Sequence, residues 1–217
     1  MDEIHKINQA SVTSTDRVYE ILKKRIIEGT SRIGQQIRIA DAAREFNVSQ
    51  TPVREALIKL SAENFVVLEP YRGAIVKGLS QSEVVEIFTI RSILEGAALE
   101  HGIPNMEEED FRIAENILMA AENERNPGTL GEINWNLHMF LYRKSKLPIL
   151  CEMIESLRSQ TDRYLRVFYS FLDPDQFVNT HLQILEACKN RDVDMAVSLL
   201  KEGIDDCIPT ISRLIGM

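Results

Sequence analysis

A short polar segment in the first third of the chain carries side chains that could read DNA. Gln50 can form two hydrogen bonds with an adenine edge, and Arg54 can reach a guanine or a phosphate. If a helix begins at Ser49, the backbone N–H groups from there to Thr51 would also attract a phosphate. Farther along the chain, Arg72 would reach an adjacent groove or the DNA backbone from the tip of a hairpin.

Each of these residues also has a purely structural explanation. Ser49 could be only a helix N-cap, Arg54 only a solvated charge and Arg72 only a turn residue. The combination favours DNA recognition, because a recognition helix needs a polar first turn and an apolar inner face. The residues at the spacing of that inner face are Val53, Ala56, Leu57 and Leu60.

Three helices and a hairpin would hold these residues in place. Apolar residues at helical spacing predict helices over residues 16–28, 38–46 and 49–62. Asn47 fits the tight turn between the last two helices, since Asn tolerates the left-handed conformation. Pro52 is tolerated in the first turn of a helix.

After the third helix the apolar period changes to that of strands. Strands are predicted at residues 65–68 and 74–76, joined by a turn at 70–73. Three helices followed by a hairpin form the winged helix-turn-helix layout, which we assign to residues 1–78. Residues 1–13 are polar and unpatterned, which predicts a mobile arm.

The rest of the chain, residues 79–217, has a helical pattern throughout. Capping boxes such as Ser80 with Glu83, together with Pro and Gly breaks, mark where helices begin and end. Six helices are predicted, over residues 80–99, 105–125, 129–145, 148–169, 173–190 and 192–215. The expected fold is therefore mainly α, with a winged helix-turn-helix followed by an all-α bundle.

The composition is that of a globular protein and excludes a membrane-spanning one. Of the 217 residues, 44% are hydrophobic and 27% are charged. No apolar run approaches the ~18 residues of a membrane span, and the N-terminus lacks the basic start of a signal peptide. The three cysteines form no C-x-x-C pair, which is typical of reduced thiols. We therefore expect a cytoplasmic protein with no membrane partner.

The net charge of −8 is unevenly divided between the two parts. Residues 1–78 contain 12 Lys and Arg against 10 Asp and Glu, which leaves +2. Residues 79–217 contain 13 against 23, which leaves −10. Such an asymmetry indicates different partners for the two parts.

The polar segment and the hairpin carry a family resemblance. Residues 48–57 read VSQTPVREAL and resemble the recognition-helix signature of the GntR family, whose usual form is GVSRTPVREAL. Asn47 stands where Gly is usual and Gln50 where Arg is usual, and the second change removes a charge from the base-reading edge. Residues 72–76 resemble the family's wing, which adds Gly73 to Arg72 as a candidate DNA contact.

The second part resembles the FCD effector domain of the FadR-like branch. The resemblance lies in residues 83–95, in the spacing of His181, Ile184 and Ala187, and in Asp192 with Ala196. It implies a domain that binds a small effector and forms a homodimer, and such a dimer would read a two-fold operator.

Many FCD domains look similar in holding a divalent metal with one Asp and three His. The corresponding positions in this chain are Asn134, His138, His181 and Gly203. Two imidazoles and an amide bring no negative charge to hold Zn²⁺ or Ni²⁺, so at most a weakly bound metal is expected. Glu202 or Cys207 could fill in, although neither is at the matching position. We favour the interpretation that His138 and His181 line a pocket and hydrogen-bond each other, water or a ligand.

Cationic and polar groups would then bind the effector. Arg91 lies where the family commonly places a pocket-facing Arg, and guanidinium binds carboxylates bidentately, so a small carboxylate is expected. An internal salt bridge with Glu95 is the alternative for Arg91. The predicted effector residues are Arg91, Asn134, His138, Arg163 and His181. For Arg158 and Arg166 we favour a surface position.

Together these features predict a sequence-specific DNA-binding transcription regulator, expected to be a repressor, controlled by a small effector. Phosphate-loop, dinucleotide-fold and nucleophile-elbow signatures do not occur, so an enzyme is not expected. A metal-dependent helical-bundle enzyme and an adaptor that does not bind DNA are the alternatives. The recognition-helix segment opposes the adaptor, which has no need of it.

Overall fold

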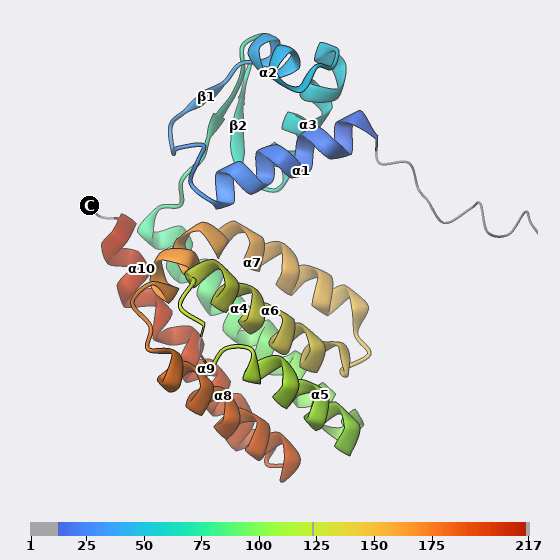
Figure 1. Ribbon diagram of the computed structural model, residues 1–217, viewed down its shortest axis with the longest axis vertical. Coiled ribbons are helices and arrows are strands. Elements are labelled where there is room, and N and C mark those ends of the chain that lie inside the picture. Colours follow the sequence, from blue (N-terminus) through green and yellow to red (C-terminus); the bar gives the residue numbers. More distant parts are fainter. Residues whose placement is uncertain (1–12, 123, 216–217) are drawn as a thin grey trace, which may run out of the picture. The chain divides into compact units, whose positions relative to one another are not determined.

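The computed structural model describes residues 13–122 and 124–215, so the predicted N-terminal arm lies outside it except for Thr13. The chain divides between Gly78 and Leu79 into two compact units, which are described separately below. One combines helices with a small sheet and the other is helical, as the predicted fold class requires (Figure 1). No helix among the described residues is long and apolar enough to cross a membrane.

The first unit has the winged-helix order that the sequence predicts, with one additional strand. Its elements are α1 (Ser14–Ile27), β1 (Gln36–Ile37), α2 (Ile39–Phe46), α3 (Gln50–Ala62), β2 (Val66–Glu69) and β3 (Gly73–Val76). Thr13 caps α1 by accepting a hydrogen bond from the backbone N–H of Asp16. Asn47 ends α2 in the left-handed conformation, with φ 53° and ψ 50°, and this confirms the predicted tight turn.

The sheet is antiparallel with the order β1-β3-β2, so the predicted hairpin is correct but incomplete. The sequence does not reveal β1, because two residues are too few to show an alternating pattern. Gly73, at φ +120°, is required for the third strand: a Cβ there would lie 2.0 Å from the carbonyl oxygen of Ile37, which belongs to β1.

The second unit contains seven α-helices among the described residues, with a short 3₁₀ turn at Ile103–Asn105. They are α4 (Gln81–Gly102), α5 (Glu108–Met119), α6 (Pro127–Arg143), α7 (Pro148–Tyr169), α8 (Pro174–Lys189), α9 (Val193–Asp205) and α10 (Cys207–Ile215). The predicted capping box of Ser80 and Glu83 opens α4. The expectation of a single last helix is wrong. Pro209 has no N–H to donate to the carbonyl of Asp205, and α9 ends at that residue.

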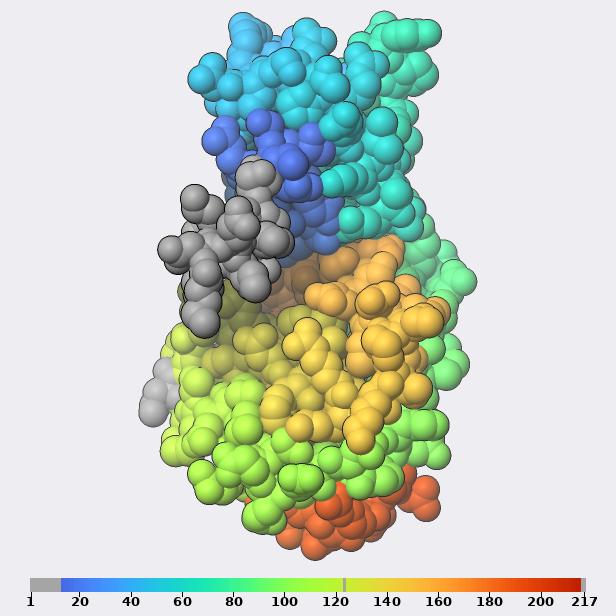
Figure 2. All heavy atoms as spheres, turned by 90° about the vertical axis from the view of Figure 1, so that its right-hand side faces the viewer, coloured from blue at the N-terminus to red at the C-terminus, as the bar shows by residue number. Residues whose placement is uncertain are grey.

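Helix α4 occupies the centre of this bundle and packs against α6, α7, α9 and α10. The side chains of α5, α6 and α7 form a continuous surface on one face of the unit (Figure 2). Beneath it lies a large apolar core that includes Phe88, Leu99, Leu137 and Ile154. Several polar and charged side chains are nevertheless buried in this unit, and they form the second of the two sites described next.

Candidate functional site

The N-terminus of α3 presents the predicted polar residues to solvent. Ser49 is the N-cap, and its side chain forms no capping hydrogen bond with the helix. Gln50, Thr51 and Arg54 are exposed. The predicted inner face is fully confirmed, since all four of its apolar residues are buried. The helix therefore has the two faces that DNA recognition needs.

A surface hollow brings the polar residues of α3 together with the hairpin tip. It is lined by Gln36, Arg38, Ile39, Ala40, Gln50, Arg54, Tyr71 and Arg72. Sequence analysis missed Arg38 as a residue of this hollow. The one sequence feature that points to it is its position directly before α2. Tyr71, also missed, is 98% exposed at the tip.

The charge of this hollow is not neutralised within the described part of the chain. Arg38, Arg54 and Arg72 form no ion pair with any described residue. Five other cations of the unit are paired with carboxylates: Lys23, Lys24, Arg25, Arg44 and Lys59. A net charge of only +2 is thus compatible with a concentrated basic surface, which is what a phosphate backbone binds. Gly73 is buried and serves the strand contact described above.

The second site is a cavity of about 130 Å³ inside the helical unit. Arg91, Asn134, His138 and His181 line it, so the structure brings together four of the five predicted effector residues. Arg163, the fifth, is half-buried and is not among the lining residues. Glu95, Gly203 and Cys207 also line the cavity.

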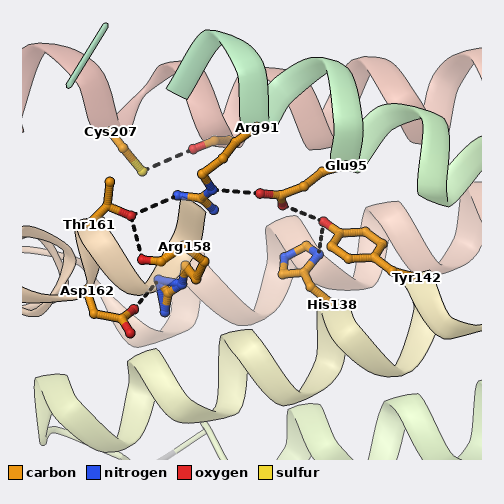
Figure 3. A network of polar contacts seen from close by, with 9 residues as sticks. Arg91, Glu95, His138, Tyr142, Arg158, Thr161, Asp162 and Cys207 are labelled. Carbon is orange, nitrogen blue, oxygen red and sulfur yellow. Dashed lines mark hydrogen bonds and ion pairs between the residues drawn. The ribbon is translucent and has the colours of Figure 1, made fainter. Parts of the chain in front are cut away.

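A continuous chain of polar contacts links Arg91, Glu95, Tyr142 and His138 (Figure 3) and continues to His181. Arg91 Nε donates to Glu95 Oε1 at 2.7 Å, and the Tyr142 hydroxyl donates to Glu95 Oε2 at 2.7 Å. His138 Nδ1 lies 3.1 Å from the Tyr142 hydroxyl oxygen, and His138 Nε2 lies 3.1 Å from His181 Nε2. Both alternatives for Arg91 are therefore realised, because it pairs with Glu95 and also lines the cavity.

Burial controls the protonation of this chain. It lowers the pKa of His181 to about 4. It also lowers the pKa of His138 well below its usual value, and the neighbouring His181 and the guanidinium groups of Arg91 and Arg158 lower it further. Both imidazoles are consequently neutral at pH 7. Burial and the carboxylate of Glu95 raise the pKa of Tyr142, so its hydroxyl stays protonated and donates.

The surface position expected for Arg158 is wrong. The residue is 5% exposed, and its side chain forms an ion pair with Asp162 at 3.0 Å. It donates to the carbonyl oxygen of Gly131 at 3.3 Å and lies over the ring of Trp135. Arg158 Nε has no hydrogen-bond partner among the described residues. The charge of the side chain misled the expectation, because helical spacing places Arg158 on the inward face of α7 with Ile154 and Thr161.

The residues at the family's metal positions do meet, but their donor set does not fit a tightly held metal. His181 Nε2 lies 2.9 Å from Asn134 Oδ1 and 3.1 Å from His138 Nε2. None of these groups is anionic, and nothing occupies the space beside Gly203 within 4 Å of where its Cβ would be. Burial raises the pKa of Cys207 to about 12, which opposes a thiolate ligand. No cluster of three His, Cys, Asp or Glu residues suited to a metal occurs in the part of the chain that the structure describes.

Comparisons with known proteins agree on both parts of the chain. Residues 14–76 match the family described as bacterial regulatory proteins of the gntR family, and residues 86–206 match the FCD domain. The HTH-type transcriptional regulator McbR of Escherichia coli K12 is 28% identical over 209 residues, which cover 93% of this chain and 90% of McbR. The gluconate operon transcriptional repressor of Bacillus licheniformis is 25% identical and covers 85% of this chain and 79% of its own.

Solved structures share the fold of this chain. The structure of E. coli McbR/YncC has a TM-score of 0.78 at 25% identity and covers 94% of this chain and 99% of its own. A GntR-type putative regulator from Rhodococcus sp. RHA1 has a TM-score of 0.74 at 23% identity and covers 91% and 96%. The second likeness is one of fold alone.

Proposed function

Because the chain belongs to the gntR family of bacterial regulatory proteins and carries an FCD domain, we propose that it is a repressor that releases its operator when a small carboxylate binds in the helical domain. It is a transcription regulator rather than an enzyme, as are the proteins it matches. The observation that supports effector control is the cavity in the helical unit, which has a guanidinium group on its wall. Such a protein acts on the chromosome, which places it in the cytoplasm.

The unpaired basic hollow of the winged helix would dock on DNA, with Gln50 and Arg54 at the bases and Arg72 at the backbone. We expect Ser49 and Thr51 to contact a phosphate through their backbone N–H groups and hydroxyls. A duplex selected from a random pool would supply the operator. Arg54→Ala should weaken binding to it by about 1–3 kcal/mol if Arg54 reads a base.

Arg44→Ala is the matched control, because Arg44 is an exposed cation of the same unit that is already paired with Asp41. It should bind the selected duplex like the wild type. Equal affinity of the Arg54→Ala variant would contradict the assigned DNA face, and failure of the wild type to select any duplex would contradict the function itself.

The homodimer is expected to form through α4. A helix buried on one side normally presents polar residues on the other, yet Val85, Ile90 and Ile93 of α4 are exposed, Ile93 to 62%. Sedimentation of the full chain should show a dimer, and Ile93→Glu should convert it to a monomer. Met119→Glu, at an equally exposed position on α5, should leave the dimer intact. A dimer that survives Ile93→Glu would place the interface elsewhere.

We further propose that divalent metals bind weakly, because the donor set lacks both charge and a fourth ligand. The double change Asn134→Asp and Gly203→His should raise Zn²⁺ affinity by several orders of magnitude, given the roughly 10–16 kcal/mol that complete structural sites supply. Open space beside Gly203 leaves room for the imidazole. Calorimetry on chelator-stripped protein tests this, and tight stoichiometric binding of Zn²⁺ by the wild type would refute it.

The effector step is tested on the protein–operator complex with a panel of small carboxylates at fixed salt. Release by at least one of them, lost in the variant Arg91→Lys, is the expected result, since Lys keeps the charge but cannot form the bidentate contact. Carboxylates that release Arg91→Lys as readily as the wild type would place the effector elsewhere.

A further inference from the structure

The polar chain along the cavity has one proton too few for its contacts. Four contacts link Glu95, Tyr142, His138, His181 and the carbonyl oxygen of Phe177. Only three protons are available to them: one on the Tyr142 hydroxyl and one on each neutral imidazole. In one of the four contacts, two acceptor atoms must therefore face each other with no proton between them.

The outer contacts decide where the proton is missing. The carbonyl oxygen of Phe177 can only accept, so His181 Nδ1, at 2.7 Å, carries the ring proton. The carboxylate of Glu95 also only accepts and takes the hydroxyl proton of Tyr142, so the proton of His138 sits on Nδ1 and points at the hydroxyl oxygen. The Nε2 atoms of both rings are left as acceptors, 3.1 Å apart.

A third acceptor is aimed at the same point. Asn134 Oδ1 lies 2.9 Å from His181 Nε2. Turning the amide over would let its nitrogen donate to His181, but the contact between His138 and His181 would still have no proton. In either orientation of the amide, the contact between the two Nε2 atoms still lacks a donor.

The cation on the cavity wall already has a counter-charge. Arg91 is paired with Glu95, and Asp206 adds a second carboxylate to the lining. A simple carboxylate would add an uncompensated negative charge to a low-dielectric interior, which is unfavourable. A molecule that carries a carboxylate and a cationic donor would enter without changing the net charge.

The size of the cavity limits such a molecule to a few atoms. Its volume of about 130 Å³ is close to the ~150 Å³ of an engineered cavity that accommodates benzene. A ligand of roughly six heavy atoms is therefore the scale that fits without rearrangement.

We infer that the effector is a small zwitterion, whose primary ammonium group donates to His138 Nε2, His181 Nε2 and Asn134 Oδ1 while its carboxylate contacts Arg91. An ammonium group has three N–H donors, one for each acceptor. The inference rests on the proposed function and specifies the ligand of the same cavity.

The test uses chelator-treated full-length protein and calorimetric titration with molecules of matched shape. Glycine, glycolate and propionate share a carboxylate and differ only in carrying an ammonium, a hydroxyl or a methyl group. β-Alanine, 3-hydroxypropionate and butyrate repeat the comparison with a longer spacing. In at least one set the amino acid should bind tenfold or more tightly than its two partners.

Variants at Asn134 sharpen the result, because this residue is half-buried and tolerates change better than the two histidines. Asn134→Asp adds a negative charge beside the ammonium group and should strengthen amino-acid binding several-fold. Asn134→Leu removes the acceptor and should weaken it several-fold. Asn136→Asp makes the same chemical change as the first variant at an exposed position of α6 and should have no effect.

Equal or tighter binding of the hydroxy acids or unsubstituted acids would overturn the inference while leaving a carboxylate effector in place. Absence of binding in both sets would also overturn it, as would amino-acid binding that requires added Zn²⁺. The proposed function fails by a different measurement, namely loss of DNA binding or of carboxylate-induced release, so the two failures are distinguishable.

Discussion

Arginine residues are used in opposite ways in the two parts of the molecule. In the winged helix, Arg54 and Arg72 are exposed and form no ion pair within the described chain. In the helical domain, Arg91 and Arg158 are about 5% exposed, and each is held by a carboxylate one helical turn away. An exposed guanidinium is available to a large polyanion, whereas a buried one is fixed in direction and suits a small ligand of defined shape. Paired and unpaired cations should therefore respond very differently to mutation.

The largest effect is expected from the buried pair. Glu95→Gln leaves the Arg91 guanidinium buried without a counter-charge, which should lower the free energy of unfolding of the helical domain by about 3–5 kcal/mol. Trp135 is the only Trp and lies in α6, so its fluorescence during urea unfolding reports on this domain. Glu132→Gln changes an exposed carboxylate of α6 and should leave the unfolding transition unchanged. A Glu95→Gln variant as stable as the wild type would show that the pair does not hold the cluster together.

The next largest effect is expected at Gly73, which follows the exposed Arg72 in the sheet of the winged helix. Gly73→Ala should destabilise the sheet by about 1–3 kcal/mol from its positive φ, and further because the new Cβ meets the Ile37 carbonyl. Faster hydrogen exchange of the β1 and β3 amides would report this. Gly34→Ala, also at positive φ but in open space, should show only the conformational part. Similar exchange in both variants would argue against the close approach of β1 to β3.

A smaller effect is expected when one exposed arginine is removed. Arg72→Ala should reduce the slope of log affinity against log salt concentration by about one, because one phosphate contact is lost. The selected operator duplex, titrated at several salt concentrations, gives this slope. The paired Arg44→Ala variant provides the comparison, and equal slopes for the two variants would remove the distinction between paired and unpaired cations.

The smallest effect should come from an exposed ion pair. Asp16 and Lys59 lie 2.8 Å apart on the surface of the winged helix. The hydrogen bond from Lys59 lowers the pKa of Asp16 below its ordinary value of 3.8, so the contribution of the pair is present at neutral pH and is lost only as the pH falls below that value. Lys59→Met should leave exchange of the α1 and α3 amides at pH 7 unchanged within error. A clear increase would show that this pair behaves like the buried ones.

Local signals in the sequence were sufficient for the three helices and the hairpin of the winged helix. The structural effects of Asn47, Pro52 and the apolar face of α3 extend over only a few neighbouring residues. They can therefore be predicted without knowing the rest of the chain. Strand β1 could not be predicted, because its two residues become a strand only by pairing with β3. Arg38 was missed for the same reason, since only the folded hollow brings it beside Arg54.

In the helical domain the family resemblance located the cavity residues better than spacing did. It placed Arg91, His138 and His181 correctly on the cavity wall. The charge pattern favoured an exposed Arg158, because a charged residue followed by Asp four positions later is typical of an exposed helix face. Arg163 was interpreted as an effector residue from its place in the helix predicted over residues 148–169, and it is not among the residues that line the cavity.

The break between α9 and α10 gives one wall of the cavity a distinct mechanical character. Asp206 and Cys207, at the break, both line the cavity, and Pro209 interrupts the ladder of backbone hydrogen bonds there. A wall made from continuous helix resists bending, whereas a joint yields first when the space beside it is filled. Under the proposed effector control, a ligand in the cavity would therefore displace α10 first, and α10 packs against α4 and α7.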